Sequence, residues 1–213
     1  MPANRTSLPS LPAESTAEGA ARRALILDVA AELFARQGFN STTLRDVAHA
    51  AALKKASVYH YFSSKDAILL AVLAEGIDEL LSGAMEAART SDPVDRLDAL
   101  LAVHLRNFEA KLAHVIVFLM ERRTLEHELA DSPEVRNYIN KRRTYDKVFV
   151  DCVRAGQRSG VFRRGDPVVL AYGILGMLNW MVQWYDPAGR LTMDRISSTL
   201  RSCALAAVAM PAP

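Results

Sequence analysis

Residues able to bind phosphates and the edges of bases gather between Thr42 and Lys65, in the stretch TTLRDVAHAAALKKASVYHYFSSK. The whole chain of 213 residues has a formal net charge of only +2 at pH 7, so its total charge does not indicate a polyanionic partner. The distribution of charge does. From Arg36 to Lys65, five Lys or Arg residues stand against the single acid Asp46, an excess of four positive charges. Contact with phosphates requires such a local excess.

Lys54 and Lys55 are the most informative residues of this stretch, because they open a predicted helix. The dipole of a helix favours carboxylates in its first turn and opposes cations there. Two lysines at this position are therefore unfavourable for the stability of the helix. Their presence indicates a functional role, such as contact with phosphate or guanine. A solvated basic surface is the alternative explanation, and the two lysines alone do not decide between them.

The elements that position these side chains are predicted to be helices. The first runs from near Glu18 to Gln37, and Gly38 suits the left-handed position just past its end. Its apolar residues recur at helical spacing: Leu25, Ile26, Val29, Ala30, Leu33 and Phe34.

Two short helices with a tight turn between them follow. Thr43 and Asp46 have the spacing of a capping box, which starts the second helix. Ala48 supplies the small residue needed where this helix crosses the third, and Leu53 anchors the turn. The segment 63–66 repeats the capping pattern and starts a long fourth helix.

Later helix starts share one pattern, an N-cap residue followed by Pro: Asp92-Pro93, Ser132-Pro133 and Asp166-Pro167. They predict helices over about 93–112, 133–159 and 167–185. The segments 114–127 and 193–209 are also helical by pattern, and no strand-like alternation occurs. The predicted fold is all-α, with about nine helices after a Pro- and Ser-rich tail over 1–17 that is expected to be disordered.

The segments TTLRDVA and SVYHYFSSKDAIL, with LFARQGF just before them, resemble the tetracycline-repressor (TetR) family of bacterial transcriptional regulators. The resemblance covers about residues 20–75. It implies a homodimer on a palindromic operator in double-stranded DNA, with an N-terminal three-helix helix-turn-helix domain over 18–66. The remaining chain, 67–213, would bind a small-molecule effector and dimerise through its last two helices.

The same resemblance assigns the contacts with DNA. Carried over by position, Thr43, Tyr59 and Lys65 would contact phosphates. Base edges or nearby phosphates would be reached by Arg45, Lys55, Ser57 and His60. Lys54 is added to the DNA contacts because its charge at the front of the helix suits phosphate or guanine. The turn departs from the family pattern, which favours Gly where Ala52 stands, Ser or Thr where Lys54 stands, and often Gly where Ala56 stands. If Ala52 takes a positive φ, the cost relative to Gly is about 1 kcal/mol.

The predicted helix 167–185 is apolar nearly all round, so it must be covered on several sides by a second subunit or by the walls of a pocket. The run from Val168 to Tyr185 approaches the length that spans a bilayer, but its Asn179 and Gln183 favour a buried helix over a membrane helix. Small residues on the last two helices would permit close packing between two copies: Gly173, Gly176, Ser198, Ala204 and Ala207.

A ligand pocket is predicted in the second domain from residues on several helices: Phe108, Phe118, Arg122, Tyr145, Phe149, Met177, Trp180 and Trp184. Each aromatic residue has a simpler explanation as filling of the core. The segment Leu175–Thr192 resembles a stretch in TetR regulators of fatty-acid and steroid catabolism, several of which respond to acyl-CoA thioesters. Anionic groups of such an effector would meet Arg106, Arg122, Arg142 or Arg143, unless these arginines lie on the surface or are paired.

The remaining motifs argue against an enzyme. No His, Cys, Asp or Glu cluster has metal-ligand spacing, and no Gly-rich phosphate loop or nucleophile elbow occurs, so neither a metal nor a cofactor is expected. Cys152 and Cys203 are expected to be small buried side chains in a reducing cytoplasm, and no signal peptide is seen. The predicted function is a ligand-released transcriptional repressor. An activator of the same fold and an effector-independent DNA-binding protein are the alternatives.

Overall fold

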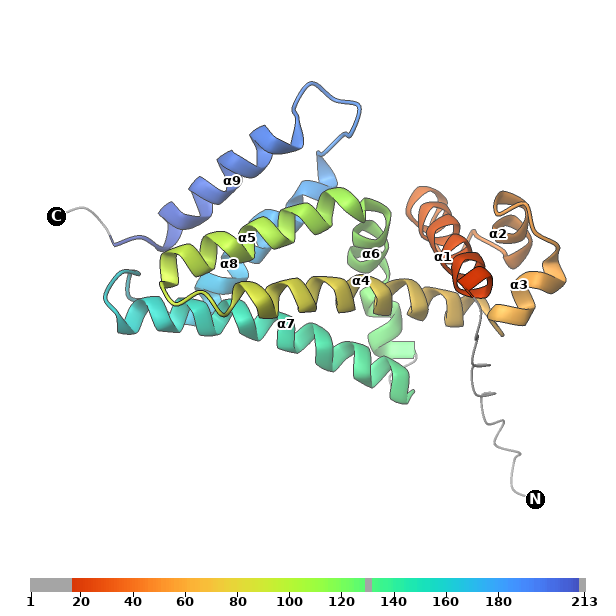
Figure 1. Cartoon of the computed structure of the whole chain (residues 1–213), viewed down its shortest axis with the longest axis horizontal. Coiled ribbons are helices and arrows are strands. Elements are labelled where there is room, and N and C mark those ends of the chain that lie inside the picture. Colours follow the sequence, from red (N-terminus) through yellow and green to blue (C-terminus); the bar gives the residue numbers. More distant parts are fainter. Residues whose placement is uncertain (1–16, 129–131, 211–213) are drawn as a thin grey trace, which may run out of the picture. The chain divides into compact units, whose positions relative to one another are not determined.

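The structure is a computed structural model that describes residues 17–128 and 132–210, with the side chains from Arg122 to Glu128 not among the described parts. Its helices are α1 (Ala17–Gln37), α2 (Leu44–Ala50), α3 (Lys55–Tyr61), α4 (Lys65–Ala87), α5 (Pro93–Ala110), α6 (Leu112–Glu128), α7 (Pro133–Arg158), α8 (Pro167–Asn179) and α9 (Met193–Val208) (Figure 1). A 3-10 helix, η1 (Trp180–Gln183), follows α8. Within the described ranges there is no strand, only a single antiparallel bridge between Phe162 and Ala209. The all-α prediction is confirmed.

The chain divides into two compact units that meet between Leu69 and Leu70, within α4. The first unit contains α1, α2, α3 and the start of α4, and the second contains the remaining helices. The predicted domain boundary at 66/67 remains a prediction, and the predicted tail over 1–17 lies outside the described residues except for Ala17, which begins α1.

The core of the first unit forms where α1, α2 and α3 present their apolar faces to one another. Its fully buried side chains include Ile26, Leu27 and Phe34 of α1, Val47 of α2 and Val58 of α3. Gly38 ends α1 with a φ of +85°, as its position in the sequence predicts. The helical spacing of the apolar residues in the sequence therefore accounts for this core.

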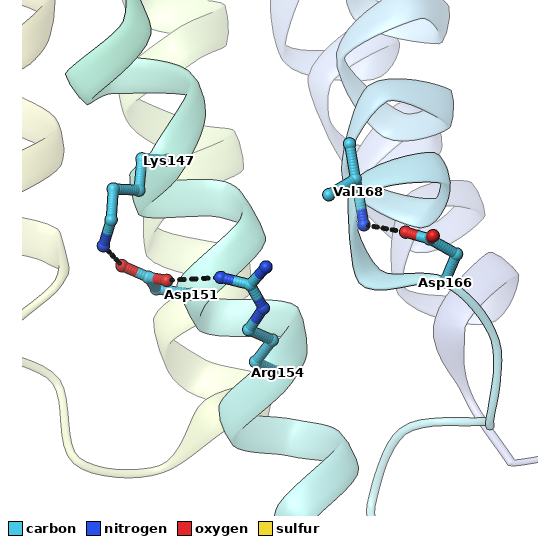
Figure 2. A network of polar contacts seen from close by, with 5 residues as sticks. All are labelled: Lys147, Asp151, Arg154, Asp166 and Val168. Atoms are coloured by element: carbon cyan, nitrogen blue, oxygen red, sulfur yellow. Dashed lines mark hydrogen bonds and ion pairs between the residues drawn. The ribbon is translucent and has the colours of Figure 1, made fainter.

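The three Pro-containing helix starts are confirmed. Asp92, Ser132 and Asp166 each accept hydrogen bonds from backbone N–H groups of the first turn of α5, α7 and α8. Figure 2 shows the last of them, where the Asp166 carboxylate accepts from the Val168 N–H at 2.7 Å. Each cap satisfies backbone donors that a helix leaves without intrahelical partners.

In the second unit, α7 packs against both α5 and α8, and α9 packs against α5. The inner face of α7 is apolar, with Tyr145 and Phe149 fully buried. Its outer face is charged, and Figure 2 shows Lys147 and Arg154 paired with the exposed carboxylate of Asp151. Surface pairs of this kind contribute roughly 0–1 kcal/mol, so the inner face is what holds α7 in place.

The predicted helix 167–185 is confirmed as an α-helix up to Asn179 and is wrong over its last six residues. The α-helix ends at Asn179, and the chain continues as the 3-10 helix η1 to Gln183. A tightened last turn is common at helix ends, and Pro187 soon after it is unsuited to a continuing helix. One face of α8 is buried, while the opposite face leaves Val169 68% and Tyr172 52% exposed in the single chain.

The two cysteines differ from each other. Cys152 is buried, as predicted, and burial raises the pKa of its thiol to about 11. Cys203 is exposed, so the prediction of a buried side chain is wrong there. The reason is its place on α9, which turns Ile196, Ala204 and Val208 inward and leaves the Cys203 face uncovered in the single chain.

Candidate nucleic-acid interface and ligand cavity

The turn between α2 and α3 has the geometry of a helix-turn-helix. Ala48 is almost fully buried, as expected for the small residue at the helix crossing. The Leu53 N–H donates to the Ala48 carbonyl at 2.8 Å and closes the turn. Ala52 takes a φ of +53°, the left-handed conformation that glycine adopts most readily. The chain therefore builds with alanine a turn whose geometry favours glycine.

The predicted capping box at the start of α2 is confirmed. The Thr43 hydroxyl donates to the Asp46 carboxylate at 2.8 Å, and the Asp46 N–H donates to the Thr43 oxygen at 3.2 Å. The hydrogen bonds from the Thr43 side chain and N–H lower the pKa of Asp46. Because the Thr43 hydroxyl proton is already donated, a phosphate at this position would compete with Asp46 for it.

The front of α3 is cationic and open to solvent. Lys54 is the N-cap residue and makes no side-chain capping bond. The Lys55 ammonium lies 5.4 Å from the centroid of the Tyr59 ring, a cation–π contact that leaves its hydrogen-bond donors free of protein acceptors within the described residues. Lys54, Lys55, Tyr59 and His60 are all exposed.

Lys65 is engaged within the unit. Its ammonium donates to the backbone carbonyls of Phe39 at 2.7 Å and Asn40 at 3.3 Å. It also lies 4.3 Å from the centroid of the Phe39 ring. Two of its three protons therefore hold the segment between α1 and α2. No local pattern predicts this role, because the partners are 25 and 26 positions away.

The structure brings most of the predicted DNA contacts to exposed positions on α2, α3 and the turn. Arg45, Lys54, Lys55, Tyr59 and His60 are exposed, Thr43 is exposed but caps α2, and Ser57 and Lys65 are half-buried. Their roles toward DNA remain predictions.

The second unit holds a cavity of about 50 Å³, room for a few water molecules. Its apolar wall comes mainly from α4, where Val72, Leu73, Ile77 and Leu80 face it. The other lining residues are Gly76, His104, Asn107, Phe108, His114, Val115, Phe118, Tyr138, Arg142 and Asn179.

A buried neutral pair forms one polar part of the cavity wall. His104 Nδ1 lies 2.7 Å from the hydroxyl oxygen of Tyr145. Burial, and then the positive charge of Arg142, lower the pKa of His104 to about 3, so its imidazole is uncharged at neutral pH. Burial raises the pKa of Tyr145, which keeps its proton.

A charged residue, Arg142, also lines the cavity and is paired with Asp146 behind the wall. Arg142 Nη1 lies 2.7 Å from Asp146 Oδ1, and the two side chains are only 13% and 14% exposed. The guanidinium also makes cation–π contacts with two rings, 4.8 Å from the centroid of Phe118 and 5.2 Å from that of Tyr145. These contacts fix the position of a cation at the edge of an otherwise mostly apolar cavity.

The predicted pocket residues are only partly brought together. Phe108 and Phe118 line the cavity, Tyr145 bonds to its wall through His104, and Phe149 packs behind Tyr145 with ring centroids 5.4 Å apart. Met177 is half-buried, while Trp180 and Trp184 are 65% and 45% exposed, and none of the three lines this cavity. Arg122 lies outside the described side chains.

His104 and Arg142 are absent from the predicted pocket set, although Arg142 is one of the four arginines considered for anionic groups. A helical signal was available for Arg142. Tyr138, Arg142, Tyr145 and Phe149 follow one another at spacings of three or four residues and so share the inner face of α7. An arginine in a stripe of buried aromatic residues is a candidate for a specific contact.

The described part of the chain shows neither a metal site nor a membrane span. It contains no group of three or more His, Cys, Asp or Glu side chains placed to hold a metal ion. None of its helices combines the length and the apolar character needed to cross a membrane.

A helix-turn-helix with a solvent-exposed cationic front, followed by a helical unit with a cavity, is the arrangement expected of a DNA-binding regulator. The comparisons with known proteins agree. Residues 26–72 match the model for bacterial regulatory proteins of the tetR family, and residues 90–208 match the tetracyclin repressor-like C-terminal domain. The chain belongs to the TetR family of transcriptional regulators, whose members are not enzymes and bind operator DNA as dimers.

Among its relatives is the transcriptional repressor KstR2 of Rhodococcus jostii, 31% identical over 94% of this chain and 97% of that protein. KstR2 of Mycobacterium tuberculosis, described as a ketosteroid transcriptional regulator, superposes with a TM-score of 0.82 at 26% identity, covering 89% of this chain and 96% of that one. AibR in complex with isovaleryl coenzyme A and operator DNA gives a TM-score of 0.76 at 26% identity, covering 85% of this chain and 97% of that one. The protein is a DNA-binding transcriptional repressor of the TetR family, of the same type as KstR2.

Proposed function

We propose that the protein is a cytoplasmic repressor that leaves its operator when an acyl-CoA thioester binds the second unit. The observation that carries the proposal is the cavity itself, which combines an apolar wall on α4 with the fixed cation Arg142. The similarity to AibR, whose structure holds isovaleryl coenzyme A together with operator DNA, supports the same class of effector.

The cavity supports binding of the acyl part of such a thioester and not of its nucleotide. At about 50 Å³ it is smaller than the roughly 300–1,000 Å³ typical of small-molecule sites. An acyl group must therefore enlarge it, and the walls that move belong to α4, α5, α6 and α7. Because α4 also begins in the first unit, displacement of its cavity wall is a direct way to affect DNA binding.

The operator would be read by two copies of the first unit. Arg45, Lys55, Ser57 and His60 are proposed to reach base edges or nearby phosphates, with Thr43, Lys54, Tyr59 and Lys65 toward phosphates. Their exposure on α2, α3 and the turn supports this assignment. Half-sites of a dimeric helix-turn-helix protein lie about 34 Å apart along DNA, so a change of a few Å in the separation of the two α3 helices weakens binding.

The two copies are proposed to pair through α8 and α9. Each helix buries one face within its own chain and leaves the other uncovered. On α8 the uncovered face combines large apolar side chains with Gly173 and Gly176. A methyl group added at either glycine would meet no atom of the described chain within 4 Å. Apolar surface next to glycines suits close packing against a second helix.

The test is release of operator DNA by acyl-CoA. Purified protein is bound to a fluorescent duplex from its own upstream region, and fluorescence anisotropy is followed while thioesters of increasing acyl size are added. We expect at least one thioester to weaken operator binding tenfold or more, while free CoA has no effect. Tight binding of a thioester without release would favour an effector that stabilises the DNA complex, as an activator or co-repressor system requires. No response to any thioester would contradict the proposed effector class.

A further inference from the structure

A chain of three polar side chains leads from the cavity to the uncovered face of α8. Arg142 lines the cavity, and its ion pair with Asp146 spans one turn of α7. The other carboxylate oxygen of Asp146 accepts a hydrogen bond from the Tyr172 hydroxyl on α8, at 3.3 Å. The chain therefore crosses from α7 to α8, the two helices with the most extensive mutual packing in this unit.

The inner end of this chain is fixed and sheltered from solvent. The guanidinium of Arg142 contacts the rings of Phe118 and Tyr145 as well as the Asp146 carboxylate, and these three contacts restrict its movement. An anionic or carbonyl oxygen that enters the cavity beside Arg142 therefore competes with Asp146 for the same guanidinium.

The outer end is open. The Tyr172 side chain is 52% exposed on the α8 face that also carries Val169, which is 68% exposed, and Trp180 at the start of η1 is 65% exposed. A change in the hydrogen bond at Asp146 therefore moves or frees a ring in the surface that we propose to pack against a second copy.

We infer that Arg142, Asp146 and Tyr172 transmit occupancy of the cavity to the α8 face. When an effector oxygen takes up Arg142, the Asp146 carboxylate loses that ion pair, and the Tyr172 hydroxyl becomes a stronger partner for the remaining negative charge. The Tyr172 ring is then drawn toward α7, and the surface of α8 changes. This inference rests on the proposed function only for the identity of the ligand, because the coupling between the three side chains exists without it. Asp146 and Tyr172 are positioning residues in this scheme, since neither lines the cavity.

A double-mutant cycle tests the coupling without any effector. Operator affinity of the full-length protein is measured for the wild type, Asp146→Asn, Tyr172→Phe and the double variant. Residues in one hydrogen-bonded network give non-additive effects, so we expect the double variant to deviate from the product of the single effects by about threefold or more. Asp146→Asn keeps an oxygen that can accept from Tyr172 while removing the charge, and it is milder than a change at Arg142.

Tyr185→Phe is the matched control. It removes a tyrosine hydroxyl from the same unit, and the Tyr185 ring packs edge-to-face on Phe108 at a centroid distance of 5.6 Å. Combined with Asp146→Asn it should be additive within about twofold. Additive behaviour of Asp146→Asn with Tyr172→Phe would overturn the inference.

Measurements with added thioester separate this inference from the proposed function. In the wild type, an active thioester should also change the fluorescence of Trp180 and Trp184, the two tryptophans of the chain. Saturating thioester weakens operator binding by some factor in the wild type, and in Tyr172→Phe this factor should be at least fivefold smaller. A change of this size lies within the usual range of allosteric coupling. A wild type that responds to no thioester contradicts the proposed effector, whereas a responsive wild type with an equally responsive Tyr172→Phe contradicts the transmission path.

Discussion

The front of the helix-turn-helix and the wall of the cavity hold their charged side chains in opposite ways. In the first unit, Arg45, Lys54 and Lys55 are exposed and have no ion pair with any described residue. In the second unit, Arg142 and Asp146 form a sheltered ion pair, and His104 is buried against the Tyr145 hydroxyl. Cations that remain in water can be transferred to phosphates without loss of an internal hydrogen bond or ion pair. Groups that are held by internal partners respond only to a ligand that competes with those partners.

The largest effect expected from this contrast is on folding stability at Arg142. Arg142→Met leaves the Asp146 carboxylate without the ion pair in a site that is 14% exposed, and should lower the free energy of unfolding by about 3 kcal/mol. Arg143→Met, at the exposed neighbouring position, should change it by less than about 0.5 kcal/mol. Urea denaturation of the two variants measures the difference. Equal stabilities would mean that the second unit, like the first, keeps its arginines in an essentially aqueous setting.

The next effect is a dependence of stability on pH that originates in the second unit. The pKa of His104 is lowered from 6.5 to about 3 by burial, so between these values the unfolded chain binds a proton that the folded chain does not. Above about pH 6.5 protonation of His104 therefore does not reduce the free energy of unfolding. As the pH falls toward 3, the free energy of unfolding decreases progressively. At pH 5 the loss is about 2 kcal/mol.

His104→Asn provides the control for this pH dependence, because an amide can replace Nδ1 as a partner for Tyr145 but does not titrate. Its stability at neutral pH is expected to be lower than that of the wild type, and its decrease between pH 7 and pH 5 should be smaller by about 2 kcal/mol. Thermal unfolding at the two pH values measures this. An unchanged decrease would place the acid sensitivity on other residues.

The contrast between the units also explains how much the sequence could predict. Signals that act over three or four residues predict the structure correctly: the Thr43–Asp46 capping box, the Pro-containing starts of α5, α7 and α8, and the left-handed residue Gly38. The helix-turn-helix is built almost entirely from such short-range signals, so its geometry follows from the sequence.

The cavity depends on partners that are far apart in the chain. His104 and Tyr145 are 41 positions apart, and no local pattern joins them. The aromatic residues Trp180 and Trp184 resemble core residues by type, yet both are exposed in the single chain, Trp180 at the start of η1 and Trp184 just after its end. Lys65 is a third example, since its bonds to Phe39 and Asn40 could not be predicted from its position at the start of α4.

A comparison of two lysines in the first unit sharpens the contrast further. Lys55→Ala should leave stability nearly unchanged, weaken operator binding by about 1–2 kcal/mol and relax the preference at particular base pairs. Lys65→Ala should lower stability by about 1 kcal/mol, because two backbone carbonyls lose a charged donor. It should also weaken binding to all sequences and lower the salt slope by about one unit, if the third proton of Lys65 meets a phosphate.

Anisotropy titrations at several salt concentrations, with operator and scrambled duplexes, separate the two lysines. A Lys65→Ala variant with wild-type stability would show that the hydrogen bonds of Lys65 to the two carbonyls do not stabilise the first unit. A Lys55→Ala variant that loses affinity equally for both duplexes would identify Lys55 as a phosphate contact.

The smallest effect concerns the backbone of the turn. Ala52 has a φ of +53°, a conformation that costs an L-residue about 1 kcal/mol more than glycine. Ala52→Gly removes this strain but also gives the unfolded chain more freedom, so a net gain of no more than about 1 kcal/mol is expected. For a chain of this size that raises the melting temperature by roughly 2–4 °C.

Ala56→Gly is the control for the turn, because Ala56 is also exposed but lies inside α3, where glycine is unfavourable by about 1 kcal/mol. The two substitutions introduce the same residue four positions apart and should shift the melting temperature in opposite directions. Operator binding should survive Ala52→Gly, since the Leu53–Ala48 hydrogen bond that closes the turn involves only backbone atoms. A lower melting temperature for Ala52→Gly would show that the strain of the positive φ is smaller than the entropy that glycine adds to the unfolded chain.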